Sequence, residues 1–110
     1  MTDVRVVLVT APEAEVAEAI CRTLLEERLI ACANVLSGMT SIYRWEGKVE
    51  RDSEVLLILK TGAAKVPRLV DRVSELHPYE VPEVLSLEVG TGLDDYLNWV
   101  GRETATQEPS

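Results

Sequence analysis

The sequence has few of the residues on which metal centres and disulfide frameworks depend. Its 110 residues include two cysteines and one histidine. Two cysteines do not make a disulfide framework, so we expect a reducing, cytoplasmic compartment. No apolar run approaches the roughly 20 residues of a membrane span. Residues 1–5 also lack the basic-then-apolar order of a secretory signal. We therefore predict no membrane partner.

Basic residues are scarce as well. Lysine and arginine total 11 against 19 acidic residues, which gives a formal net charge of −8. This balance argues against nucleic acid as a partner and is compatible with cations, although acidity also serves simply to keep a protein soluble. With 46% apolar and 27% charged residues, the composition is that of a soluble globular protein with a real core.

The chain also lacks recognisable catalytic motifs. It has no glycine-rich phosphate loop, and no local motif supplies the base that a cysteine nucleophile needs. We therefore expect no enzymatic activity and no organic cofactor.

The stretch 31–61 is the dominant feature of the sequence and predicts a long β-hairpin. Two strands meet at residues 45–48, where Gly47 can adopt the positive φ of a tight turn. The first strand, 31–46, would span about 50 Å if straight, whereas a domain of this size is roughly 35 Å across. Ser37-Gly38 therefore predicts a bulge or bend. We expect the overhanging hairpin to lie on another copy of the chain; the alternative is that it curls over its own helix.

Alternation along the first strand places Met39, Tyr43 and Trp45 on one face, where we predict packing at a subunit interface. The outer half of the returning strand is charged. Glu50, Asp52 and Glu54 alternate on one face there, which suits either a hard cation or, as we favour, a solvated face with salt bridges. The inner half, 55–59, is apolar on both faces, as in a central strand.

The remaining elements alternate between strands and amphipathic helices. The predicted ranges are a strand at 4–9, a helix at 12–28 capped by Thr10, a helix at 63–76, an extended linker at 77–82, a strand at 83–89 and a helix at 93–102. Residues 1–102 form one predicted domain, and residues 103–110 a disordered tail.

This order predicts an α+β, ferredoxin-like βαββαβ sandwich with a short C-terminal helix. Right-handed crossovers give the sheet order 4-1-3-2 with the helices on one face. The two central strands are 4–9 and the returning hairpin strand, which is apolar on both faces over 55–59. The second face then needs a cover that the chain itself does not supply, which predicts an oligomer.

Six ordered motifs carry a resemblance to a known family. They are TAP at 10–12, ACANV at 31–35, SIYRWEGK at 41–48, EVLLILKT at 54–61, HPYEVPE at 77–83 and YLNW at 96–99. Together they resemble the CutA family of divalent-cation tolerance proteins, from about residue 4 to residue 100. The resemblance implies a homotrimer like that of the PII signalling proteins, with three sheets around a threefold axis and hairpins that reach across to neighbours.

The resemblance also implies a response to copper and other divalent cations. Metal binding in the family is linked to a cysteine before TAP and to two histidines before PY. Here these positions hold Val9 and Leu76-His77. Because imidazole and thiolate are good ligands for copper, we take His77 and Cys32 as the candidate metal ligands, with weak binding of Cu²⁺ or another divalent cation. The alternatives are a hydrogen-bonded His-Pro turn and a small buried cysteine.

A second class of function is a PII-like module that signals or binds a protein partner and holds a small ligand in clefts between subunits, with metal incidental. For this ligand cleft we name Lys60, Glu54 and Tyr79. Lys60 ends the apolar run and would bind an anionic ligand, unless it merely extends its ammonium group to the surface.

Overall fold

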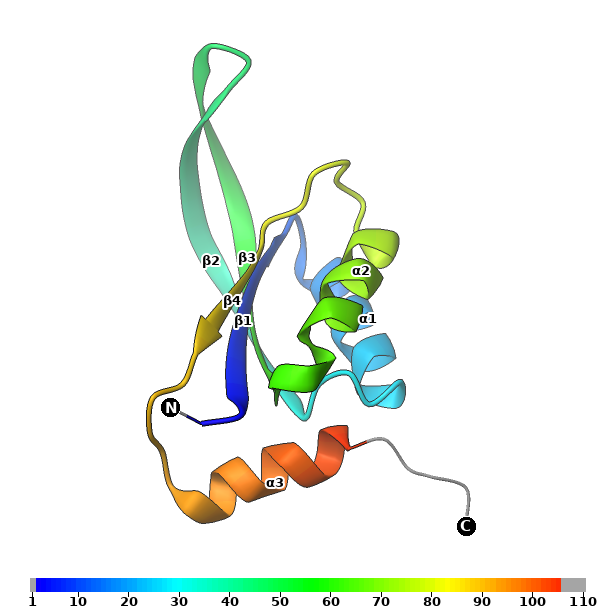
Figure 1. The fold of residues 1–110 in the computed structure, drawn as a ribbon. Coiled ribbons are helices and arrows are strands. Elements are labelled where there is room, and N and C mark those ends of the chain that lie inside the picture. Colours follow the sequence, from blue (N-terminus) through cyan, green and yellow to red (C-terminus); the bar gives the residue numbers. More distant parts are fainter. Residues whose placement is uncertain (1, 106–110) are drawn as a thin grey trace.

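A four-stranded antiparallel sheet with strand order β2-β3-β1-β4 organises the protein (Figure 1). The computed structural model describes residues 2–105. Its elements are β1 (Val4–Ala11), α1 (Ala14–Glu26), β2 (Cys32–Trp45), β3 (Lys48–Gly62), the 3₁₀ turn η1 (Ala63–Lys65), α2 (Val66–Leu76), β4 (Val84–Glu88) and α3 (Asp94–Thr104). The ferredoxin-like class and the predicted strand order are confirmed, with β1 and β3 at the centre.

One face of the sheet packs against α1 and α2, and the main hydrophobic core lies between these layers (Figure 1). Alternate residues of the two central strands point into it. Val7, Val9, Leu57 and Leu59 are fully buried there. The helices contribute buried side chains at the spacing of one apolar stripe: Ala17, Ile20, Cys21 and Leu24 from α1, and Leu69 and Val73 from α2. Complete burial of one such aliphatic side chain stabilises the fold by about 1.5–3 kcal/mol.

The opposite face of the sheet, which we call the open face, is also apolar. Cross-strand pairing places Leu8 beside Ile58 and Leu85 on it. Leu85 is 54% exposed and Leu87 is 49% exposed. α3 crosses one end of this face, where Val100 packs on Val4 and the Tyr96 hydroxyl contacts the Cys32 sulfur. Within residues 2–105, no helix lies over the rest of it (Figure 1). The open face therefore leaves a contiguous apolar surface without a cover from its own chain.

The β2–β3 hairpin extends well beyond the two-layered body (Figure 1), and the molecule measures 52 × 29 × 22 Å. The predicted bulge is confirmed: the register shifts between Leu36 and Met39, and Gly38 has a φ of +84°. Gly47 has the expected positive φ in the turn. Glu46 also has a φ of +48°, which the sequence did not indicate.

Several predicted element ends differ from the structure. β1 continues to Ala11, so Thr10 is a strand residue and not a helix cap; α1 begins at Ala14 without a side-chain cap. α3 continues to Thr104, whose hydroxyl donates to the Val100 carbonyl at 2.9 Å. Residues 103 and 104 therefore belong to the helix and not to the predicted tail. Residues 106–110 lie outside the described residues.

Candidate functional site

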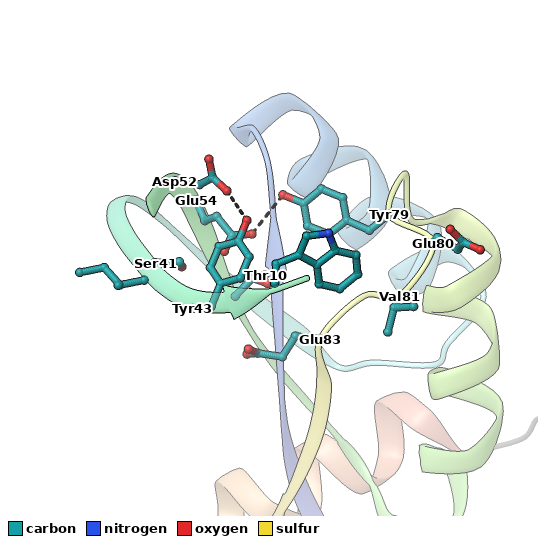
Figure 2. Close-up of a pocket in the computed structure, with 11 residues that line it drawn as sticks. Thr10, Ser41, Tyr43, Asp52, Glu54, Tyr79, Glu80, Val81 and Glu83 are labelled. Atoms are coloured by element: carbon teal, nitrogen blue, oxygen red, sulfur yellow. Dashed lines mark hydrogen bonds between the residues drawn. The ribbon is translucent and has the colours of Figure 1, made fainter. Parts of the chain in front are cut away.

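A cavity of about 600 Å³ lies between the outer half of the hairpin and the segment that connects α2 to β4 (Figure 2). Its walls come from three strands and this segment. The lining residues are Thr10, Ser41, Ile42, Tyr43, Trp45, Asp52, Glu54, Tyr79, Glu80, Val81 and Glu83. The cavity thus combines aromatic walls with carboxylates, and we call it the hairpin cavity.

Two tyrosine–carboxylate hydrogen bonds organise the hairpin cavity. The Tyr79 hydroxyl donates to Glu54 Oε2 at 3.1 Å, and the Tyr43 hydroxyl donates to Asp52 (Figure 2). The hydrogen bond to Asp52 raises the pKa of Tyr43 to about 12. Partial burial, together with the hydrogen bond to Glu54, raises the pKa of Tyr79 to about 12. Both phenols are therefore neutral donors across the physiological pH range.

His77 is buried and both of its ring nitrogens have hydrogen-bond partners. Nε2 lies 2.7 Å from the Thr10 carbonyl oxygen, and Nδ1 accepts from the Tyr79 N–H at 3.0 Å. The carbonyl requires the proton on Nε2, so Nδ1 is the acceptor. The imidazole thus joins the end of β1 to the start of the α2–β4 segment. A metal ion would have to displace one of these hydrogen bonds.

Cys32 and Lys60 lie at the other end of the sheet, where they are directly paired across β2 and β3. The Cys32 sulfur lies 3.3 Å from the Tyr96 hydroxyl, and Lys60 donates to the Asn34 side chain. Lys60 is six residues from Glu54 along β3, which corresponds to about 20 Å of extended strand. The structure therefore brings Glu54 and Tyr79 together in one cavity, but it places Lys60 outside it.

The two candidate metal ligands are also apart within one chain. Cys32 pairs with Lys60, which in turn pairs with Val6, whereas His77 contacts Thr10 at the opposite end of β1. In residues 2–105, no three His, Cys, Asp or Glu side chains are grouped so that they could hold a metal ion. Any site with several strong ligands would need donors from more than one chain.

The predicted interface residues share the hairpin face that turns toward the cavity. Tyr43 and Trp45 line the cavity and are 40% and 53% exposed, while Met39 is half-buried and paired with Glu54. The lining residues that the sequence did not indicate are Thr10, Ser41, Ile42, Glu80, Val81 and Glu83. The HPYEVP motif was the available signal. The extended linker predicted at 77–82 is wrong in detail, because the chain bends at residues 78–81 as it passes the hairpin.

Comparison with known proteins gives the family. The family model described as CutA1 divalent ion tolerance protein matches residues 5–103. The chain belongs to this family. It is 50% identical over 99 residues to the divalent-cation tolerance protein CutA of Thermus thermophilus, which covers 90% of this chain and 96% of that protein. It is 48% identical over 102 residues to human protein CutA, which covers 93% of this chain and 57% of the human protein.

Solved structures of CutA proteins have the same fold. The Thermus thermophilus structure superposes with a TM-score of 0.90 at 48% identity, covering 93% of this chain and 99% of that one. The Xylella fastidiosa structure gives 0.92 at 41% identity, with 94% and 100% covered. The predicted family, the function class of divalent-cation tolerance and the absence of an enzymatic role all agree with this membership.

The names of relatives place them in more than one compartment. An Arabidopsis relative is described as chloroplastic, and the Archaeoglobus fulgidus structure as periplasmic. Within residues 2–105, no helix is long and apolar enough to span a membrane.

Proposed function

We propose that this protein acts in divalent-cation tolerance as a cytoplasmic homotrimer that binds copper or another divalent cation weakly. The open face carries the proposal. A contiguous apolar sheet surface with two leucines about half exposed is unfavourable in water, and burying it against other copies removes that cost. The number three is taken from the family resemblance.

Weak metal binding follows from how the candidate donors are held. His77 would have to give up a hydrogen bond to coordinate an ion, and Cys32 lies at the opposite end of the sheet. A trimer presents each donor three times, so ligands of different subunits can complete a site that one chain lacks. Copper is the expected ion for imidazole and sulfur donors.

Native mass spectrometry with and without stoichiometric Cu²⁺ tests both parts of the proposal. We expect a trimer that takes up a fixed number of ions, with uptake reduced in His77→Ala and Cys32→Ala. The matched control is Cys21→Ala, because Cys21 is a buried core residue on α1. A trimer without uptake, or uptake unaffected by both candidate substitutions, would contradict the metal assignment and leave the assembly standing.

A second candidate function is a PII-like module that binds a small ligand, with metal incidental. The hairpin cavity favours it, because about 600 Å³ is within the range of small-molecule sites and its walls are aromatic. Its placement beside the predicted interface residues would make ligand binding sensitive to assembly.

A further inference from the structure

We propose that the hairpin cavity binds a small organic cation, an alkylammonium or guanidinium group held against aromatic rings. This inference rests on the second candidate function, a small-ligand role for the cavity. It also reverses the ligand charge expected from the sequence, because Lys60 lies outside the cavity.

The charge of the lining residues favours a cation. Asp52, Glu54, Glu80 and Glu83 line the cavity, and the described lining residues include no lysine, arginine or histidine. The hydroxyl groups of Tyr43 and Tyr79 point toward the carboxylates of Asp52 and Glu54 (Figure 2). These phenols are neutral donors, so they fix the carboxylates in position without cancelling their charge. An anionic ligand would meet net repulsion here.

The shape of the cavity favours an organic cation over a bare metal ion. A divalent metal ion needs several oxygen atoms within about 2–2.6 Å of one point. The acidic residues here are instead spread around a space of about 600 Å³, and no group of three in residues 2–105 is close enough for a metal ion. A bulky ammonium group is satisfied by diffuse negative charge and does not require such convergence.

Aromatic rings supply the second half of the recognition. Tyr43, Trp45 and Tyr79 all line the cavity. The face of an aromatic ring carries negative electrostatic potential and attracts organic cations, with tryptophan the strongest. Tyr79 is itself held by its ring contact with His77, whose centroid lies 4.7 Å away. This arrangement of aromatic rings with nearby carboxylates is the kind that recognises quaternary ammonium groups.

Choline is the probe that we would titrate into the full chain by calorimetry at low ionic strength. Its neutral carbon analogue, 3,3-dimethylbutan-1-ol, has the same shape without the charge. We expect choline to bind at least about tenfold more tightly than the neutral analogue, with weaker binding at high salt. Equal binding of the two compounds, or no binding at tens of millimolar, would overturn the proposal.

Substitutions locate the site. Glu54→Gln retains an oxygen acceptor for Tyr79 and removes only charge, so it should weaken choline binding by about three- to tenfold. Glu26→Gln removes the same charge from the exposed outer face of α1 and should leave binding unchanged. Tyr79→Phe should retain most of the affinity, and Tyr79→Leu should lose about two- to fivefold. Equal effects of Glu54→Gln and Glu26→Gln would overturn the assignment, because they would indicate only a general charge effect.

The mass and copper uptake of the same samples separate this inference from the proposed function. A trimer that binds copper but not choline overturns only the cavity assignment, for example because a neighbouring hairpin fills the cavity. Choline binding by a monomer would support the cavity and contradict the trimer.

Discussion

His77 is both a candidate metal ligand and a buried residue with a structural role. Its side chain is 7% exposed, and its two nitrogens join the end of β1 to the α2–β4 segment. A buried group of this kind stabilises the fold whether or not it ever meets a metal ion. Its substitution must therefore be measured for stability before any change in copper uptake is interpreted.

We predict that His77→Ala lowers the free energy of unfolding by about 2–3 kcal/mol, because it leaves the Thr10 carbonyl and the Tyr79 N–H without partners. His77→Asn should cost less, since an asparagine oxygen can accept from the N–H two residues ahead and restore one hydrogen bond. Guanidinium unfolding at fixed protein concentration measures both values. A loss under about 0.5 kcal/mol for the alanine variant would contradict the structural role.

Cys21 gives a prediction with a defined pH window. Burial, with a smaller contribution from the charge of Glu18, raises the pKa of the Cys21 thiol from 9.0 to about 11. Between these values the unfolded chain loses the thiol proton while the folded chain keeps it. The unfolded state is therefore favoured progressively as pH rises from 9 to 11.

We expect the stability of the wild-type chain to fall across this pH window relative to Cys21→Ala, which lacks the thiol. Unfolding free energies measured at several pH values for both proteins provide the test. Parallel curves would show that the thiol titrates alike in both states. Three tyrosines also have raised pKa values, but they are present in both proteins. Their contribution to the pH dependence of stability therefore cancels in the comparison.

At the scale of elements, the hairpin depends on two glycines in the left-handed region. Gly38 at the bulge has a φ of +84°, and Gly47 in the turn has a φ of +79°. A Cβ added at either position would meet no heavy atom within 4 Å, so the cost of alanine there is conformational rather than steric.

We predict that Gly38→Ala and Gly47→Ala each destabilise the protein by about 1–2 kcal/mol. Gly90→Ala is the matched control, because Gly90 has equal space around it without a positive φ. It should be neutral or slightly stabilising. Chemical denaturation of the three variants measures the differences, and equal effects at all three positions would contradict the conformational explanation.

The sequence predicts these elements well where the pattern is local. Apolar runs on both faces identified β1 and β3 as central strands, and Ser37-Gly38 located the bulge. Glu46 could not be foreseen in the same way, because its positive φ follows from the two-residue turn and not from any preference of glutamate. Threonine suits a helix cap, which explains the wrong prediction for Thr10, but strand pairing with Leu56 keeps this residue in β1.

The candidate site was harder to predict, because it depends on contacts between distant segments. Lys60 and Glu54 were both predicted to line one ligand cleft, but they lie six residues apart along the extended strand β3. Tyr79 meets Glu54 only because the α2–β4 segment runs beside the hairpin, and no local pattern encodes that approach. The same contact gathers Val81 and Glu83 at the hairpin cavity.

At the scale of the whole molecule, one chain leaves two features unexplained by its own packing. The open face exposes Leu36, Leu85 and Leu87, and the hairpin extends the molecule to 52 Å. Both are accounted for if other copies cover the sheet and receive the hairpin. A net charge of −8 then keeps the assembly soluble while leaving its surface attractive to cations.

The proposed assembly depends on the covering of the open face by other copies, and sedimentation equilibrium of the wild-type protein at micromolar concentration tests this directly. We expect a single species with three times the 12.2 kDa mass of the chain. A species that remains at 12.2 kDa across the micromolar range would contradict the trimer, because the apolar sheet face would then be stable in water without a partner.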